Sequence, residues 1–197
     1  FVVLVLTGIY LMFFFAASQA ETVYQGQYRA LEGVTMSRAY RSVLRISFDV
    51  RAGLVMRQMH HWAPLVFVAA ILVHLGRVFF TGAFRRPREI NWMVGVSLLL
   101  LAIFNGFAGY SLVDDQLSGT GLRIAHAVAL SVPLVGTWIV SLLLGGEFPG
   151  PDIIERLFVL HILLLPTIIG VLIAVHLAIV LRQKHTQFAG PGRREDN

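Results

Sequence analysis

The stretch Arg57-Gln-Met-His-His-Trp62, with its continuation Ile71-Leu-Val-His-Leu-Gly-Arg77, predicts one apolar helix that carries two histidines. His60 and His74 are 14 positions apart. At about 100° per residue, this spacing leaves the second side chain roughly 40° short of four full turns. Both rings therefore share one face of the helix, roughly 21 Å apart along its axis. His61 lies about 140° out of line with His74.

A second apolar segment repeats this arrangement with His161 and His176. These residues are 15 positions apart, which in a regular helix places the second about 60° past four turns. Two helices, each with a histidine near one end and another four turns further on, can face each other. The sequence therefore predicts two metal centres stacked across a membrane, with one histidine from each helix at each level.

The composition is that of a membrane protein. Charged residues make up 14% of the 197 positions, whereas soluble domains contain about 25%. The net charge of +5 does not indicate nucleic acid as a partner, because the arginines cluster in loops between apolar runs. Cysteine is absent from the sequence, which excludes a cysteine-ligated iron–sulfur cluster, a covalently attached haem and a disulfide within this chain. A redox cofactor here must therefore be held by histidine.

Four apolar segments predict an all-α membrane protein built as a bundle of four transmembrane helices. The predicted spans are residues 1–17, 60–80, 92–112 and 157–181. The first is near the lower limit for a span, and the chain starts inside an apolar run without a methionine, so we expect a longer protein. Residues 119–145 contain an apolar stretch interrupted by Pro133 and Gly136. This stretch is too short to cross comfortably and predicts a helical hairpin at the interface between the third and fourth spans.

Loop charge predicts the orientation of the bundle. The short loop at residues 81–89 carries Arg85, Arg86 and Arg88, and a basic tail follows residue 181. By the positive-inside rule, both the loop and the C-terminal tail lie in the cytoplasm, which predicts a multi-pass protein of the cell membrane. Residues 38–49 are expected to form a surface helix without a chemical role.

Glycines recur at the spacing of the histidines. Gly95 and Gly109 are 14 positions apart, the step that separates His60 from His74, so they lie on one face at two heights. Such glycines either let helices pack closely or let flat cofactors approach the backbone, because glycine has no Cβ. The shared spacing favours two flat cofactors. Thr7-Gly8 in the first span leaves the same two interpretations open.

Bis-histidine haem accounts best for the four histidines. An ionisable residue inside a membrane span is functional by default, because an unpaired polar ring is costly there. A packed, hydrogen-bonded role can explain one histidine but not four at matched levels, and two imidazoles per level fall short of the four ligands of zinc. Haem propionates need cations, and Arg57 and Arg77 each lie one turn beyond a histidine, towards opposite membrane faces. The sequence thus predicts two non-covalent haems b, stacked within the bundle.

Several motifs, in this order, resemble the N-terminal, four-helix half of cytochrome b, the membrane subunit of the respiratory cytochrome bc quinol oxidoreductases. Besides the histidines, the motifs are Asn91-Trp-Met-Val-Gly95, Gly109-Tyr110, Val132-Pro-Leu-Val-Gly136, Arg156-Leu-Phe158 and Pro166. Together they cover nearly all of the chain. The resemblance implies one cytochrome b N-terminal haem-binding domain over residues 1–197.

By this resemblance, each haem takes one ligand from each histidine helix. His60 and His161 would ligate the low-potential haem near the outer membrane face. His74 and His176 would ligate the high-potential haem near the inner face. The glycines that would make room for the haems are Gly8 and Gly109 for the outer one and Gly95 for the inner one.

Two departures from the mitochondrial cytochrome b pattern indicate which branch of the family the sequence resembles. The 15-residue spacing of His161 and His176 is one longer than the mitochondrial spacing and is of the plastid type, with the extra residue between His161 and Pro166. Asp114-Asp115 replaces part of the family's Pro-Trp-Gly. This variant and the tail at residues 184–192 resemble actinobacterial cytochrome b, which implies menaquinol as the substrate.

The resemblance implies the di-haem subunit of a proton-translocating quinol–cytochrome c oxidoreductase. Quinol would be oxidised at an outer site bordered by Tyr110 and Gly121, and quinone reduced near the inner face. The implied partners are a Rieske-type iron–sulfur protein, a cytochrome c or c1-like subunit, the C-terminal half of cytochrome b, the lipid bilayer and a second copy of the complex. Alone, this chain is not expected to be a competent enzyme. Asp114 and Asp115 could accept quinol protons or act as solvated turn carboxylates.

Other functions stay open on the residues alone. One is a di-haem membrane anchor subunit of another quinone-linked dehydrogenase. A second is a non-redox transporter with a histidine proton relay, and a third is a purely structural anchor. The last two predict a colourless protein.

Overall fold

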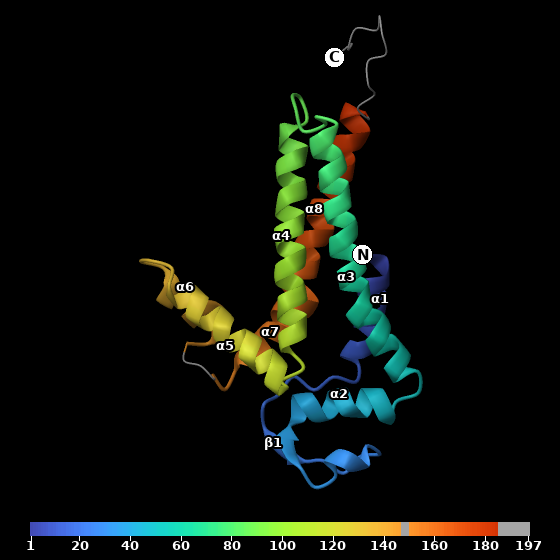
Figure 1. The fold of residues 1–197 in the computed structure, drawn as a ribbon, viewed down its shortest axis with the longest axis vertical. Helices are drawn as coiled ribbons and strands as arrows, with labels where there is room; N and C mark the ends of the chain where they lie inside the picture. Colours follow the sequence, from blue (N-terminus) through green and yellow to red (C-terminus); the bar gives the residue numbers. More distant parts are fainter. Residues whose placement is uncertain (147–149, 185–197) are drawn as a thin grey trace, which may run out of the picture.

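The computed structural model describes residues 1–146 and 150–184 and is almost entirely helical (Figure 1). Its helices are α1 (Val2–Met12), η1 (Arg29–Leu31), α2 (Arg38–Phe48), α3 (Gly53–Phe80), α4 (Glu89–Ser111), α5 (Gln116–Leu130), α6 (Gly136–Leu144), α7 (Ile153–Val159), η2 (Leu160–Leu164) and α8 (Leu165–Gln183). Two short strands, β1 (Glu21–Val23) and β2 (Thr35–Ser37), pair antiparallel, with Glu21 opposite Ser37. Residues 185–197, most of the predicted cytoplasmic tail, lie outside the described residues.

Three helices of the described chain are long and apolar enough to cross a membrane: α3, α4 and the continuous helix Ile153–Gln183 formed by α7, η2 and α8. Their surfaces carry large exposed hydrophobic side chains such as Val73, Phe80 and Leu181, which water would not favour. The chain is therefore a membrane protein with a helical bundle, as its composition predicts. These helices cover the last three of the four predicted spans. All three begin several residues earlier than predicted, α3 ends at its predicted limit, α4 ends one residue earlier, and the long helix ends two residues later.

The first predicted span, residues 1–17, is shorter in the structure than expected. Helix α1 covers only 11 residues, and the chain leaves the helix at Phe13. A long-range hydrogen bond fixes the segment that follows α1, because the Ala16 N–H donates to the Ser42 hydroxyl of α2, 3.1 Å away. Further along, the Ala39 N–H donates to the Ser18 carbonyl at 2.9 Å. These bonds to α2 replace the next helical turn, which sequence periodicity could not predict.

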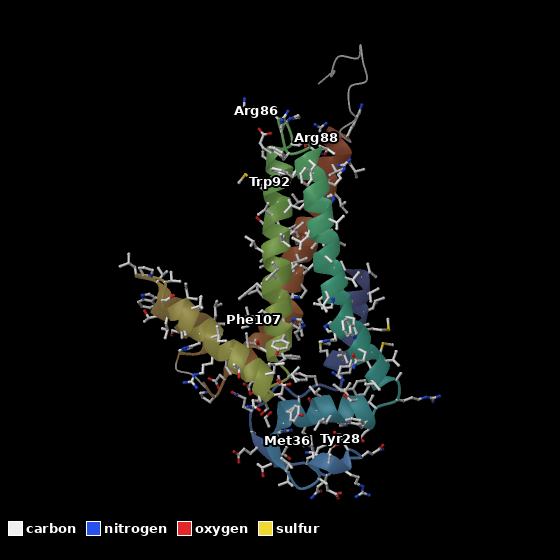
Figure 2. The ribbon with its side chains drawn as sticks, viewed as in Figure 1. Tyr28, Met36, Arg86, Arg88, Trp92 and Phe107 are labelled. Carbon is white, nitrogen blue, oxygen red and sulfur yellow. The ribbon has the colours of Figure 1, made fainter. Side chains whose placement is uncertain are left out.

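The long helices run side by side, and the remaining elements gather at one end of them (Figure 1). Helix α4 packs against both α3 and α8, and α1 lies beside the N-terminal part of α3. The loop between α3 and α4 and the end of α8 lie together at the far end. Figure 2 shows Arg86 and Arg88 at that end, and Tyr28 and Met36 at the opposite end.

The buried core lies at the end of the bundle where α2, α4, α5, α6 and α7 meet. Its fully buried side chains include Ala39, Ala108, Ile154 and Leu157. The expected helix at residues 38–49 is present as α2, and the Ser37 hydroxyl caps its start by accepting from the Tyr40 N–H. It is buried on two sides, because Ala39 packs in this core and Leu44 packs against Tyr24 and Met36. This core fixes the ends of α4 and of the long helix that carries His161.

The predicted helical hairpin is present as α5 and α6, which pack against each other. It begins earlier than the expected residues 119–145, because Asp115 caps α5: its carboxylate accepts from the Ser118 N–H at 2.8 Å, and the Ser118 hydroxyl lies 3.0 Å from the Asp115 N–H. Gly136 makes the tight return possible. A Cβ there would lie 2.6 Å from the Ala129 carbonyl oxygen, closer than real side chains come.

Candidate functional site

The structure brings the four predicted histidines together in two pairs between α3 and the long C-terminal helix. In the first pair, the rings of His60 and His161 have centroids 6.0 Å apart and planes at 89°. In the second pair, the rings of His74 and His176 have centroids 6.3 Å apart and planes at 81°. The two pairs thus have nearly the same geometry at two levels of the bundle. The ring of His61, on the same helix, instead forms a T-shaped contact with Trp62, with centroids 5.3 Å apart.

Hydrogen bonds at the first pair fix which ring nitrogen carries the proton. The His161 Nδ1 lies 2.9 Å from the Asn105 carbonyl oxygen, which can only accept, so Nδ1 carries the hydrogen. The His60 Nδ1 lies 2.9 Å from the Thr7 hydroxyl oxygen. The Thr7 hydroxyl donates its one hydrogen to the Val3 carbonyl, 2.7 Å away. Towards His60 it therefore acts as an acceptor, and the hydrogen is on His60 Nδ1. Both rings are therefore left with a free lone pair on Nε2.

The second pair makes weaker polar contacts. The His176 ring lies near the backbone of Asn91, one turn before Gly95 on α4, but its buried Nδ1 makes no full hydrogen bond within 1–146 and 150–184. His74 is exposed on the surface of α3. The rings nevertheless stand in nearly the arrangement of the first pair, because the same two helices carry both pairs.

The three glycines predicted to make room for the cofactors, Gly8, Gly95 and Gly109, each lie against a histidine ring. A Cβ on Gly109 would lie 2.8 Å from both ring nitrogens of His161, so no larger residue fits there without moving the ring. A Cβ on Gly8 would lie 3.2 Å from His60 Cε1, and one on Gly95 would lie 3.4 Å from His176 Cε1. The bare backbone at Gly109 lets the His161 ring reach the Asn105 carbonyl, one turn earlier on α4.

The two arginines predicted to lie near haem propionates, Arg57 and Arg77, have different surroundings. Arg57 is half-buried, and its Nε has no hydrogen-bond partner among the described residues. A buried, unsatisfied guanidinium N–H is costly, and an anionic group beside it would relieve that cost. Arg77 is exposed. Arg88, at the start of α4, also has a buried Nε without a partner, although its Nη2 donates to the Gln183 carbonyl at 3.4 Å.

The two residues predicted to border a quinol site lie side by side. A Cβ on Gly121 of α5 would lie 3.7 Å from Tyr110 Cε1 of α4, an ordinary contact distance. Tyr110 keeps 40% of its surface exposed at this junction of α4 and α5. Asp115, nearby in sequence, acts as the N-cap of α5. That contact favours the structural interpretation of this carboxylate over proton transfer.

Each histidine pair offers two imidazoles and nothing else to a metal ion. Within the described ranges, no group of three or more histidine, cysteine, aspartate or glutamate side chains is placed to bind a metal. Two nitrogens per level suit an ion whose other ligands come from a flat macrocycle, and they do not suit structural zinc.

Two residues of this site have a role that the sequence did not predict. Thr7 and Asn105 hold the Nδ1 atoms of the first pair, as residues around metal-ligating histidines commonly do. Thr7 was singled out together with Gly8, but only as part of a close-packing or cofactor contact and not as a hydrogen-bond partner of His60. Asn105 acts through its backbone carbonyl, so its side chain gave no signal.

The comparisons with known proteins agree on a single family. Residues 65–197 match the family model described as cytochrome b (N-terminal)/b6/petB. The cytochrome bc1 complex cytochrome b subunit of Mycobacterium tuberculosis is 61% identical over 198 residues, which is 100% of this chain and 36% of that protein. The subunit of the same name from Streptomyces coelicolor is 57% identical over 197 residues, with the same two shares.

A solved structure, named as a hyperthermophilic respiratory Complex III, matches with a TM-score of 0.79 at 22% identity. The match covers 100% of this chain and 48% of that one, and it supports the fold alone. The chain spans about a third of the length of the curated relatives that it matches. On the family match, which covers more than half of its residues, the chain belongs to the cytochrome b N-terminal family.

Proposed function

We propose that this chain is the part of a cytochrome b subunit that binds two haems b, and that it works in a quinol–cytochrome c oxidoreductase. His60 and His161 would hold one haem, and His74 and His176 the other. The observation that carries this proposal is the pair of near-identical ring arrangements, with centroid separations of 6.0 and 6.3 Å. When bound, two haems supply one-electron carriers at two depths of the membrane.

The spacing within each pair fits one metal ion between the two rings. Two metal–imidazole bonds of about 2.0 Å, plus roughly 1 Å from each nitrogen to its ring centre, add up to roughly 6 Å. The tautomers of His60 and His161 leave Nε2 free to bind. The unsatisfied Nε of Arg57, one turn from His60, suits a propionate carboxylate. The residues present therefore fit the haem that the family implies.

The proposed substrates are quinol at one membrane face and quinone at the other, with menaquinol favoured by the Asp114-Asp115 variant. The contact of Tyr110 with Gly121 supports a quinol-site border at the junction of α4 and α5. The curated relatives are named as subunits of a cytochrome bc1 complex. We infer similar partners here: a Rieske-type iron–sulfur protein, a cytochrome c or c1-like subunit, the C-terminal half of cytochrome b, and a second copy of the complex.

We further propose that the Arg86–Arg88 end of the bundle faces the cytoplasm of a cell whose plasma membrane holds the complex. Loop 81–89 is short and rich in arginine, the pattern that sets orientation in membrane proteins. The histidine pair nearer that end is His74–His176, which would make it the inner, high-potential haem site. His60–His161 would be the outer, low-potential site.

The test is to purify the native complex and add a reduced menaquinone analogue while following b-haem absorbance and cytochrome c reduction. The proposal predicts that both signals respond and that His61→Ala, beside His60 but outside the pairs, leaves them unchanged. A colourless complex would overturn the proposal in favour of a transporter or structural anchor. A haem-containing complex that purifies with a flavin-linked dehydrogenase and does not reduce cytochrome c would favour the anchor of another enzyme.

A further inference from the structure

We propose that the wide helical turn η2, Leu160–Leu164, is a register device that sets His176 on the same helix face as His161. This inference rests on the proposed haem-binding function. Apart from His161, the residues of η2 act by positioning the helix and not by binding a cofactor.

The two helices differ by one residue between their histidines. His60 and His74 are 14 positions apart and, in a regular helix, the second lies about 40° short of four turns. His161 and His176 are 15 positions apart, which in a regular helix leads to about 60° past four turns. Two regular helices would thus present their second histidines about 100° out of step. The structure instead has both pairs in nearly equal geometry.

The extra residue is taken up in η2. There the backbone follows the wider i→i+5 pattern, and the Leu165 N–H donates to the Leu160 carbonyl, five residues earlier. A single turn of this kind adds one residue to an α-helix, while the helix on either side continues in its own register. Beyond η2, His176 therefore lies where a 14-residue spacing would put it. The long helix matches α3 despite its longer sequence.

The surroundings favour the turn at this place. Pro166 cannot donate to the Ile162 carbonyl, so the regular hydrogen-bond pattern is already interrupted there. Leu163, inside the turn, is 62% exposed, so the wider turn is accommodated on the outer side of the helix. On either side, Leu157 and Leu165 are buried at 1% and 5% exposure, which holds both flanks of the turn in place.

The proposal is tested by two single-residue deletions in the full chain within the native complex. Deletion of Leu163 removes one residue inside the turn, and deletion of Val171 removes one residue after it. Both remove an exposed apolar side chain, and both leave His161 and His176 14 positions apart. The variants have the same spacing and differ only in whether the extra residue of the turn is kept.

The readout is haem per chain, with reduced-minus-oxidised spectra compared with that of His74→Ala. We expect the Leu163 deletion to keep two haems, because the turn closes into a regular α-helix. We expect the Val171 deletion to keep the turn, to rotate His176 by about 100°, and to lose the same haem as His74→Ala. Equal haem content in the two variants, or loss of either haem from the Leu163 deletion, overturns the register proposal. A wild-type complex without haem overturns the proposed function itself.

Discussion

The ring of His60 stands perpendicular to the ring of His161, with their centroids 6.0 Å apart, although 101 positions separate the two residues in the chain. Each ring donates its Nδ1 hydrogen to a residue of another helix, Thr7 of α1 or Asn105 of α4. Four helices thus meet at this one site. The position of the two rings therefore depends on neighbours from α1 and α4.

Gly109→Ala is expected to abolish the outer haem site. The new methyl would lie 2.8 Å from both ring nitrogens of His161 and would push the ring away from the Asn105 carbonyl. We expect one haem per chain to be lost, with the inner haem spectrum intact. The matched control is Gly106→Ala on the same helix, where an added Cβ meets no atom within 4 Å. Two haems retained in Gly109→Ala would contradict the packing described here.

Gly95→Ala should be much milder than Gly109→Ala. Its Cβ would lie 3.4 Å from His176 Cε1, which is at the close end of ordinary van der Waals contact. The ring therefore needs to move little or not at all. We expect both haems to remain, with a small change in the inner haem spectrum. Low-temperature difference spectra of the purified complex measure this change. Complete loss of the inner haem would mean that the glycine makes room for the cofactor and not only for the histidine.

Thr7→Val keeps the shape of the side chain and removes the acceptor for His60 Nδ1–H. Loss of such a partner typically weakens metal binding by about 10- to 100-fold. We therefore expect the outer haem to dissociate more readily during detergent purification, whereas the inner haem stays bound. Ser97→Ala, which removes a hydroxyl bonded only to the Met93 carbonyl of its own helix, is the control. An outer haem as stable as in the wild type would argue against a role for Thr7.

Arg57→Leu should lower the midpoint potential of the outer haem. Removal of a half-buried positive charge makes it harder to add an electron nearby, because the reduced site carries more negative charge. Arg57→Lys, which keeps the charge but loses the fork of donors, should show a smaller drop. Potentiometric titration measures both variants. Arg29→Leu, at an exposed ion pair with Glu32, should leave the potential unchanged.

Asp115→Asn separates a structural carboxylate from a proton acceptor. Asparagine is as good an N-cap as aspartate, so the α5 cap and quinol oxidation should both persist. Asp115→Ala should destabilise the complex by about 0.5–2 kcal/mol through loss of the cap. Thermal unfolding and quinol oxidation rates, with Asp114→Asn beside them, make the comparison. An Asp115→Asn variant that is stable but inactive would show that the carboxylate moves a proton.

Helical periodicity alone was enough to predict the main features of the site. The 14-residue step from His60 to His74 placed both rings on one face, and the apolar segments around them required a membrane. The structure agrees for α3, which is one continuous α-helix from Gly53 to Phe80, whereas the long C-terminal helix departs from this period at η2. Gly109 was likewise found from its spacing, and the structure adds that it faces the His161 ring directly.

Features that depend on distant contacts could not be read from the sequence. Helix α1 ends early because the Ser42 hydroxyl, 26 positions away, accepts from the Ala16 N–H. The role of Thr7 depends on the docking of α1 against α3. The 15-residue spacing of His161 and His176 was visible, but the sequence did not show where the chain takes up the extra residue. That depends on which local hydrogen-bond pattern forms around Pro166.

The most direct test is the haem-to-protein ratio, with reduced-minus-oxidised spectra, of the purified complex carrying His60→Ala, His74→Ala or His61→Ala. The account predicts two b-type haems per chain in the wild type and in His61→Ala. It predicts one haem in each of the other two variants, with different spectra, because each variant loses a different haem. A wild-type chain without haem would contradict the account, and so would loss of the same haem from both His60→Ala and His74→Ala.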